Sequence, residues 1–459
     1  MLPHDVSAVK RDPAFGGPAF SIESEQASDP GPTEQYSRRR FIKLVTGGVI
    51  GSWVLIPVPQ NSPARYIVAR EELVPDDDER FWRVVRSQFP LTAERIYLNN
   101  GTMGPSPYVV LESVKHALES IDVSADYGGW EVARPRLAKF VNVEEAEISL
   151  THNVTEGINV VAWGLPLKRG DEVIMTTHEH AGNALPWLNR QRLDGIVIKT
   201  LKPGMTADEN LNRINDLITR RTRAIAIPHI TCTTGQIFPA KEVSKLGHDK
   251  GLWVFFDGAH GPGMTELDLR DIGCDFYATC CHKWMLGPKG TGFLFVRKEM
   301  LDVCQAKWVG GYSDAGWDMT TDPPEFKGYV PTAHRYDFAT QNAAIYIGLG
   351  AAIDFLYQIG MSNIVRRGKA MATFLQQELV KMGDRVEMLT PAEDRSRGFV
   401  VGFRLKNMDF NKFGEYAAQK GFRIRLVGEG HLNSIRISTH IYNNYDEVNR
   451  FLDIVKEVA

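Results

Sequence analysis

Short apolar runs alternate with amphipathic stretches along most of the chain from Arg65 onward. Apolar runs of four to six residues bounded by turn residues are typical of buried strands. We predict strands at 147–150, 172–177, 196–200, 224–228, 252–256, 276–279 and 292–297. Apolar residues at helical spacing predict helices at 107–120, 158–165, 183–193, 208–220 and 240–250. Strands that alternate with such helices predict an α/β fold with a mainly parallel sheet covered on both faces.

The pattern starts again after residue 358. A helix at 343–356 precedes this point, and beyond it helices are predicted at 362–382, 410–420 and 445–458, with strands at 385–389, 398–405, 422–427 and 434–439. We therefore predict a large domain over residues 65–358, which includes an N-terminal segment of the small domain, and a smaller C-terminal α/β domain over 359–459. Residues 303–334 are rich in Gly, Pro, Trp and Tyr and predict a long functional loop.

The first 64 residues depart from this pattern. Residues 1–36 are rich in Pro, Gly, Ser and acidic side chains, which predicts disorder. The basic heptad at 37–43 precedes an apolar stretch at 44–58 that is too short and too rich in glycine for a good spanning helix. Basic, apolar and then small residues form the order of an export signal. The alternative is a basic N-terminal helix that packs on the domain.

The heptad Ser-Arg-Arg-Arg-Phe-Ile-Lys closely resembles the twin-arginine export signal, with Ile42 where that signal has Leu. The resemblance implies export in the folded state, with a bound cofactor, by the twin-arginine machinery. We therefore expect a periplasmic or otherwise exported protein that is cleaved after Ala64.

Composition and charge exclude several classes of protein. The 459 residues carry 53 Lys and Arg against 56 Asp and Glu, a net charge of −3, which argues against a dedicated nucleic-acid binder. The mean hydropathy of −0.23 and the absence of an apolar run of about 18–20 residues argue against a stable membrane span. Five cysteines exclude a disulfide scaffold, and we interpret all five as core or site-lining residues.

Polar side chains follow the predicted strands where ligands bind in open α/β sheets, at the carboxyl ends. Asp257 ends the apolar run 252–256, and Lys283 comes 26 residues later, after the next run. A buried carboxylate needs a cationic partner. Lys283 is therefore either paired with Asp257 or covalently occupied. His178 and His180 follow the run 172–177.

Pyridoxal phosphate would use both groups. Its aldehyde forms a Schiff base with a lysine, and its ring nitrogen keeps its proton beside a carboxylate. Its phosphate needs backbone N–H donors at the start of a helix, which residues 153–157 supply. His180 could stack on the ring. Three alternatives stay open: a structural ion pair, a metal-dependent hydrolase that uses His178 and His180 with His260 or His282, and a non-catalytic binding protein.

Together these segments resemble the signature of class V aminotransferase-like, fold-type-I pyridoxal-phosphate enzymes. The residues that carry the resemblance are Asp257-Gly258-Ala259-His260 and the run 282–292, and it extends from about Tyr97 to the C-terminus. The run 97–102 and the Asp-Gly-Ala-His variant are most similar to the isopenicillin N epimerase-like members, whose relatives include C–S lyases. The resemblance implies a large mainly parallel-sheet domain, a smaller C-terminal α/β domain and pyridoxal 5'-phosphate as cofactor.

The resemblance also implies a role for each matching residue. Lys283 would form the Schiff base and act as general base, and Asp257 would hold the ring nitrogen. Cofactor contacts are implied for Val154, Thr155, His180, Asn183, Asp257, His260, His282, Lys283 and Thr340. Arg436 and Asn100 would bind the substrate. Thr340 would reach the phosphate of a neighbouring subunit, which implies a homodimer with shared sites. The open alternatives are a helix-capping role for Thr340, a strand-end structural role for His180 and a surface salt bridge for Arg436.

The implied reaction begins with removal of the Cα proton of an amino-acid-like small molecule by Lys283. Return of a proton gives epimerisation, loss of a group from Cβ gives lyase chemistry, and hydrolysis of a tautomer gives transamination. The resemblance favours an epimerase, with a C–S lyase or an aminotransferase as alternatives. Cysteine desulfurases of this family carry a nucleophilic cysteine in the loop that precedes Arg436. Residues 425–433 contain no cysteine, which argues against a desulfurase that forms a protein persulfide.

Overall fold

The computed structural model describes residues 54–56, 66–68, 79–126 and 128–459. The predicted disordered tail, the twin-arginine signal and its cleavage site lie outside the described residues. Two short strands, β1 (Val54–Ile56) and β2 (Tyr66–Val68), pair with each other in antiparallel fashion.

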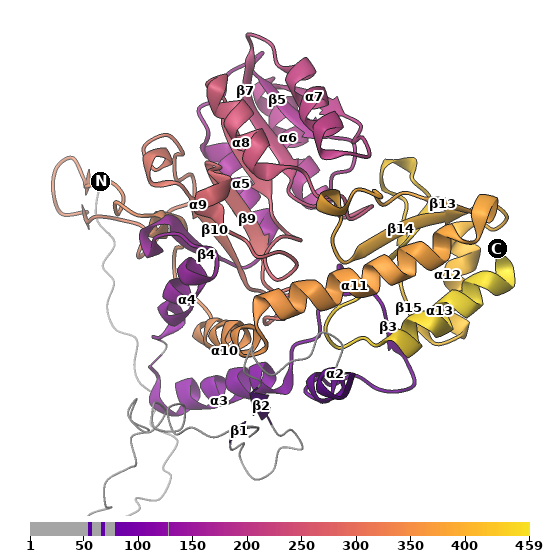
Figure 1. Ribbon diagram of the computed structural model, residues 1–459. Coiled ribbons are helices and arrows are strands. Elements are labelled where there is room, and N and C mark those ends of the chain that lie inside the picture. The colour runs from indigo at the N-terminus through magenta and orange to yellow at the C-terminus, as the bar shows by residue number, and fades with distance from the viewer. Residues whose placement is uncertain (1–53, 57–65, 69–78, 127) are drawn as a thin grey trace, which may run out of the picture. The chain divides into compact units, whose positions relative to one another are not determined.

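A seven-stranded sheet forms the centre of the fold (Figure 1). Its strands, in spatial order, are β4 (Ile148–Thr151), β10 (Gly292–Val296), β9 (Phe276–Cys280), β8 (Trp253–Asp257), β7 (Thr222–Pro228), β5 (Glu172–Thr176) and β6 (Val197–Leu201). The strands from β6 to β9 are parallel, and β10 runs antiparallel to both of its neighbours. The prediction of a mainly parallel sheet is confirmed.

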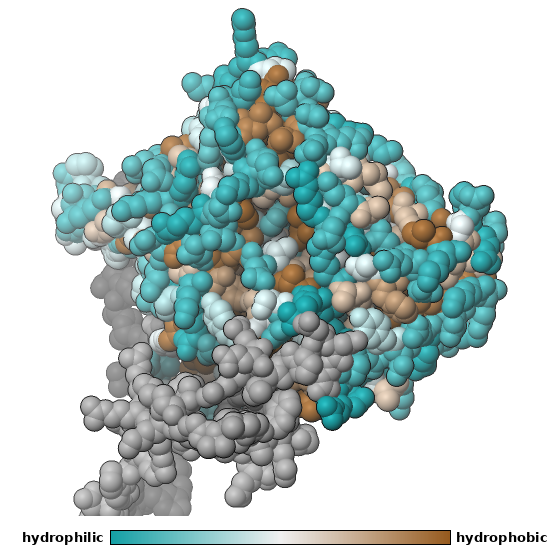
Figure 2. Space-filling model, in the orientation of Figure 1, coloured by the Kyte–Doolittle hydropathy of each residue, from teal (hydrophilic) through white to brown (hydrophobic). Residues whose placement is uncertain are grey.

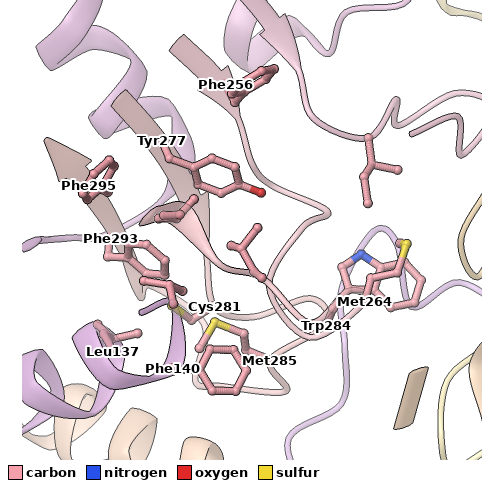
Figure 3. Close-up of a cluster of buried hydrophobic side chains, with 14 of the residues drawn as sticks. Leu137, Phe140, Phe256, Met264, Tyr277, Cys281, Trp284, Met285, Phe293 and Phe295 are labelled. Carbon is pink, nitrogen blue, oxygen red and sulfur yellow. The ribbon is translucent and has the colours of Figure 1, made fainter. Parts of the chain in front are cut away.

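Apolar side chains of the sheet pack on both of its faces. Phe256 and Tyr277 belong to one buried cluster, which Figure 3 shows with Phe293 and Phe295, and Phe255 belongs to the cluster on the opposite face. Burial on both faces explains the nearly continuous apolar runs of these strands. The helices of this part are α3 (Tyr108–Ser124), α4 (Ala133–Phe140), α5 (Val154–Gly164), α6 (Ala181–Asp194), α7 (Ala207–Leu217), α8 (Ala240–Asp249), α9 (Leu269–Ile272) and α10 (Ala343–Ile359). Hydrophilic residues cover most of the face drawn in Figure 2.

A second, four-stranded sheet lies in the C-terminal part. Its strands pair in the order β13 (Val386–Met388), β14 (Val400–Leu405), β17 (Ser434–Ser438) and β16 (Arg425–Val427), all antiparallel. The helices of this part are α11 (Met361–Val380), α12 (Phe410–Gln419) and α13 (Tyr445–Val458), and α2 (Glu79–Arg86) lies near the start of the described chain. Strand β3 (Ile96–Tyr97) pairs with β15 (Phe422–Arg423), so an N-terminal segment joins the C-terminal part.

Three predicted elements differ from the structure. The single strand predicted at 422–427 is wrong, because β15 pairs with β3 whereas β16 pairs with β17. The helix predicted from Ile158 begins at Val154, because the Asn153 side chain accepts a hydrogen bond from the Glu156 amide and caps the helix there. The long loop predicted at 303–334 contains a short hairpin, β11 (Trp317–Asp318) with β12 (Glu325–Phe326).

In the part of the chain that the structure describes, no single helix is long and apolar enough to cross a membrane. Helices α10 and α11 meet that criterion only as a pair, with a bend of 77° between them.

Candidate active site

The predicted site residues follow the carboxyl ends of neighbouring strands of the large sheet. Asp257 is the last residue of β8, and Lys283 follows the adjacent strand β9 by three residues. His180 follows β5, and Val154 begins helix α5 just after β4. Parallel strands end at the same edge of a sheet, so distant parts of the sequence meet there.

Lys283 faces His260, and Trp284 sets the orientation of that histidine. The Lys283 Nζ atom lies 3.3 Å from His260 Nε2, and the indole Nε1 of Trp284 donates to His260 Nδ1 at 3.0 Å. Burial and the Lys283 charge hold the pKa of His260 well below its usual range, so the ring is neutral. Since Nδ1 accepts, the proton sits on Nε2 and is directed at the lysine. The His260 ring therefore fixes the direction from which the Lys283 amine is contacted.

Asp257 is buried without a cationic partner among the described residues. Its carboxylate accepts a hydrogen bond of 2.9 Å from the Ala259 amide, and burial raises the pKa of the carboxyl group despite the nearby Lys283 charge. Among the described residues no salt bridge joins Lys283 to Asp257, and the Lys283 amine lies instead 3.3 Å from His260 Nε2. A buried carboxylate in this state would be stabilised by a cation such as a protonated pyridine nitrogen.

His180 begins helix α6 and accepts at Nδ1 a hydrogen bond of 3.0 Å from the Gly182 amide. Burial, with the Lys283 and Arg425 charges, lowers the pKa of His180 to about 4, so its ring is neutral. A Cβ atom on Gly182 would lie 2.8 Å from Thr155 Oγ1 and 3.1 Å from His180 Nδ1. Gly182 therefore lets the start of α5 and the His180 ring approach each other, as a cofactor with both a ring and a phosphate requires.

The start of helix α5 offers donors for an anion. Asn153 caps the amide of Glu156, whereas the amides of Val154 and Thr155 belong to the first turn, which has no partners within a helix. The Nδ1 atom of His282 is buried, and no group in the described part of the chain forms a hydrogen bond with it. Burial, with the Lys283 and Lys289 charges, lowers the pKa of His282 to about 4. These groups suit a phosphate, which takes hydrogen bonds from several neutral donors.

Arg436 lies fully buried in β17. Its guanidinium donates to the Cys232 carbonyl at 2.7 Å, to Asn99 Oδ1 at 3.1 Å and to Thr102 Oγ1 at 2.8 Å, and its Nε atom has no partner among the described residues. Burial and the Arg425 charge lower the pKa of Arg436 to about 9. The alternative of a surface salt bridge is wrong, because Arg436 is 0% exposed and these partners are uncharged. An unpaired buried cation is suited to a substrate carboxylate.

Gly101 lies directly against that guanidinium. A Cβ atom at Gly101 would lie 3.3 Å from the Cζ and Nη2 atoms of Arg436 and 3.3 Å from His260 Cε1. The Gly101 position therefore connects the guanidinium with the histidine that faces Lys283.

Three of the predicted residues have other surroundings in the structure. Asn183 is fully buried and donates to Glu179 Oε2 at 2.8 Å while it accepts from Trp187 Nε1 at 3.2 Å. Asn100 is also fully buried, and its amide group lies 3.4 Å from the Lys283 carbonyl. Thr340 is exposed and lies two residues before Asn342, the N-cap position of α10, so the helix-capping alternative for Thr340 is wrong.

Sequence reasoning missed Asn99, Thr102 and Trp284. Asn99 and Thr102 hold the Arg436 guanidinium, and Trp284 holds His260. Asn99 stands next to the predicted Asn100, and Trp284 next to Lys283, so proximity to a predicted residue was the available signal. Among the described residues, no group of three His, Cys, Asp or Glu side chains is placed to hold a metal ion. All five cysteines are buried and free, as predicted.

The family model for class-V aminotransferases matches residues 121–451. The chain belongs to the aminotransferase class-V family. This family consists of pyridoxal-phosphate enzymes, so the predicted enzyme class and cofactor are confirmed. The groups described above fit that cofactor. Lys283 would bind its aldehyde, Asp257 its ring nitrogen, and the start of α5 with His282 its phosphate.

Relatives of two kinds each cover 82% of this chain. A probable cysteine desulfurase from Methanothermobacter thermautotrophicus is 28% identical over 82% of this chain and 97% of its own. An isopenicillin N epimerase from Amycolatopsis lactamdurans is 28% identical over 82% of this chain and 98% of its own. Cysteine desulfurases dominate the matches, so the epimerase resemblance is shared by a minority of the relatives.

Solved structures share the fold-type-I architecture. An apo cysteine desulfurase from Thermococcus onnurineus is 25% identical, with a TM-score of 0.73 over 81% of this chain and 96% of that one. The cystine C–S lyase C-DES, in complex with its product cysteine persulfide, is 23% identical, with a TM-score of 0.74 over 81% of this chain and 100% of that one. The predicted fold class is confirmed.

Proposed function

We propose that this protein is a pyridoxal-phosphate-dependent C–S lyase that expels a sulfur group from Cβ of an amino acid. The observation that carries the proposal is the loop at 425–433 of this chain, which lacks a cysteine although the chain is similar to cysteine desulfurases. Without that thiol, the sulfur leaves into solution and no protein persulfide is formed. One of the structural neighbours is named as a cystine C–S lyase.

The cysteine beside the site supports this choice. Cys232 offers its backbone carbonyl to Arg436, and burial raises the pKa of its thiol to about 11. A thiol is nucleophilic only as the thiolate, so Cys232 is a poor acceptor for sulfur at neutral pH. Elimination needs no such acceptor.

Four side chains of this protein have separate roles in the elimination. Pyridoxal phosphate, when bound, provides an electrophilic carbon for the substrate amine and a ring that accepts the electron pair left at Cα. Arg436 binds the substrate carboxylate, and Lys283 removes the Cα proton. Asp257 holds positive charge at the ring nitrogen, and His260 orients Lys283. The Cβ–S bond then breaks, and the sulfur departs with the bonding electrons.

An epimerase is the second candidate, favoured by the similarity to isopenicillin N epimerase. It shares the removal of the Cα proton with the lyase but returns a proton from the opposite side.

We also propose a homodimer in which Thr340 reaches the partner's phosphate site, because Thr340 is exposed on the single chain. Export by the twin-arginine route is proposed from the heptad at 37–43, and Arg38→Lys with Arg39→Lys would retain the protein in the cytoplasm.

The test follows the products of L-cystine with the purified full-length holoprotein. The proposal expects one pyruvate and one ammonium for each cystine consumed, together with a persulfide. Lys283→Ala should abolish both products and the visible absorbance of the Schiff base between the cofactor and the lysine. Cys232→Ala should keep at least half of the activity, whereas a persulfide-transferring desulfurase that used Cys232 would lose it. Formation of the D-isomer without pyruvate would establish the epimerase instead.

A further inference from the structure

Two arginines stand side by side on one face of the small sheet. Arg425 on β16 is directly opposite Arg436 on β17 in an antiparallel register. Directly opposite residues place their side chains on the same face, about 4.5–5.5 Å apart at Cβ. Arg436 is fully buried, whereas the Arg425 side chain is 20% exposed. Like charges in such a pair are destabilising unless anionic groups lie nearby.

Glu429 is the anionic group that the chain provides. It forms a salt bridge with Arg425, and its own side chain is 30% exposed. The turn that carries it includes Gly430, His431 and Asn433, all with positive φ between 44° and 59°. A Cβ atom on Gly430 would lie 3.0 Å from the Thr177 carbonyl oxygen, so the turn lies against the end of β5 that leads to His180. Non-glycine residues in this conformation cluster at functional sites.

The Arg425–Glu429 pair lies within electrostatic reach of the site. The Arg425 charge lowers the pKa of His180 and of His260, and the Glu429 charge raises that of His180. Two cations, Arg425 and Arg436, and the Glu429 anion therefore lie close enough to act on the histidines of the site. Arg436 is assigned to the substrate's α-carboxylate, which leaves Arg425 and Glu429 without a function in elimination.

We propose that Arg425 and Glu429 form a subsite for a second amino-acid group at the far end of the substrate. The planar guanidinium of Arg425 would bind the distal carboxylate, and Glu429 would bind the distal ammonium. A zwitterion can exchange with this ion pair without leaving either charge unpaired, and the partial exposure of both side chains gives it access. The inference rests on the proposed function and selects, among sulfur amino acids, those with two amino-acid ends.

Four thioethers with the same leaving atom test the subsite. L-cystathionine carries both distal charges, S-(3-carboxypropyl)-L-cysteine only the carboxylate, S-(3-aminopropyl)-L-cysteine only the ammonium, and S-propyl-L-cysteine neither. We expect the wild-type holoprotein to bind L-cystathionine at least about tenfold more tightly than S-propyl-L-cysteine. KM for pyruvate formation and Kd from calorimetric titration of the Lys283→Ala protein, supplied with pyridoxal phosphate, are measured for each compound.

Single variants then separate the two side chains. Arg425→Gln should raise the Kd of the two compounds with a distal carboxylate about tenfold and change the Kd of S-propyl-L-cysteine less than twofold. Arg425→Lys should restore part of the lost affinity. Glu429→Gln should weaken the two compounds with a distal ammonium. Arg395→Gln, which breaks an exposed ion pair with Asp208, is the matched control and should change none of them.

Equal Kd values for the four compounds in the wild type, or variants that weaken all four equally, would overturn the subsite. Failure of the proposed function has a different signature. If no compound yields pyruvate but calorimetry still shows the charge preference, the lyase is refuted and the subsite stands. If pyruvate forms without the preference, the lyase stands and the subsite is refuted.

Discussion

Gly261 lies in the turn that carries His260, and its missing side chain makes room for Tyr277. A Cβ atom at Gly261 would lie 1.8 Å from the Tyr277 hydroxyl oxygen, 3.1 Å from the ring Cζ and 3.2 Å from His229 Nδ1. Tyr277 is fully buried in the cluster of Figure 3, where it cannot move without displacing its neighbours. We therefore expect Gly261→Ala to lower the free energy of unfolding by about 2 kcal/mol, within the usual range for overpacking.

The clash involves mainly one atom, so removing that atom should relieve it. The Tyr277 hydroxyl lies 2.9 Å from His229 Nδ1, and Tyr277→Phe leaves this buried nitrogen unpaired, at a cost of about 1–2 kcal/mol. In the double variant the closest ring atom is 3.1 Å from the new Cβ. The two losses should therefore combine to less than their sum, by about 1 kcal/mol or more.

Urea unfolding followed by tryptophan fluorescence measures the four stabilities, and visible absorbance of the bound cofactor reports the site on the same samples. Because His260 stands next to Gly261, the single glycine variant should also lose activity, and Tyr277→Phe should restore part of it. Gly311→Ala is the control, since a Cβ there meets nothing within 4 Å. Strictly additive losses, or a Gly261→Ala protein as stable as the wild type, would refute the packing described for this turn.

Three further results are expected. Burial lowers the pKa of His229 and of His440 to about 4. As the pH falls below 6.5, these two histidines take up protons in the unfolded chain before they do so in the folded one. The free energy of unfolding should therefore fall between pH 6.5 and 4 by on the order of 3 kcal/mol per histidine. A urea midpoint that stays constant from pH 7 to 4.5 would contradict this. Arg436→Lys should raise KM about 100-fold without changing the absorbance of the bound cofactor, because a lysine lacks the planar fork; equal KM values would remove Arg436 from substrate binding. Thr340→Val should weaken pyridoxal-phosphate binding about tenfold if two chains share their sites, as measured by fluorescence titration, and unchanged affinity would argue against sharing.

Residues at strand ends were predictable because the alternation of apolar strands with helices predicts a mainly parallel sheet. Once β5, β8 and β9 were recognised as parallel, the residues that follow them, His180, Asp257 and Lys283, had to meet at one edge. Their chemistry, a lysine near a buried carboxylate, then indicated the cofactor. The helix start at Val154 was harder to predict, because the cap that Asn153 forms depends on a local hydrogen bond.

The sequence could not show which of two adjacent residues of the same type contacts the site. Asn99 contacts Arg436, whereas Asn100 lies against the Lys283 backbone, and nothing in the order of the two letters distinguishes them. Asn183 was predicted to touch the cofactor, yet its amide contacts Glu179 and Trp187. Such directions depend on how the backbone enters each turn.

The sequence alone predicted the class of fold and the residues that end each strand, because these follow from apolar periodicity along one segment at a time. Side-chain chemistry together with the family resemblance indicated the cofactor. Only the tertiary structure decided which charges face one another across sheets. Arg425 and Arg436 are eleven residues apart along the chain but opposite each other in the ladder, and Glu429 is brought to them by a turn in left-handed backbone. The register of two strands and the direction of a turn depend on long-range packing, which no local pattern contains.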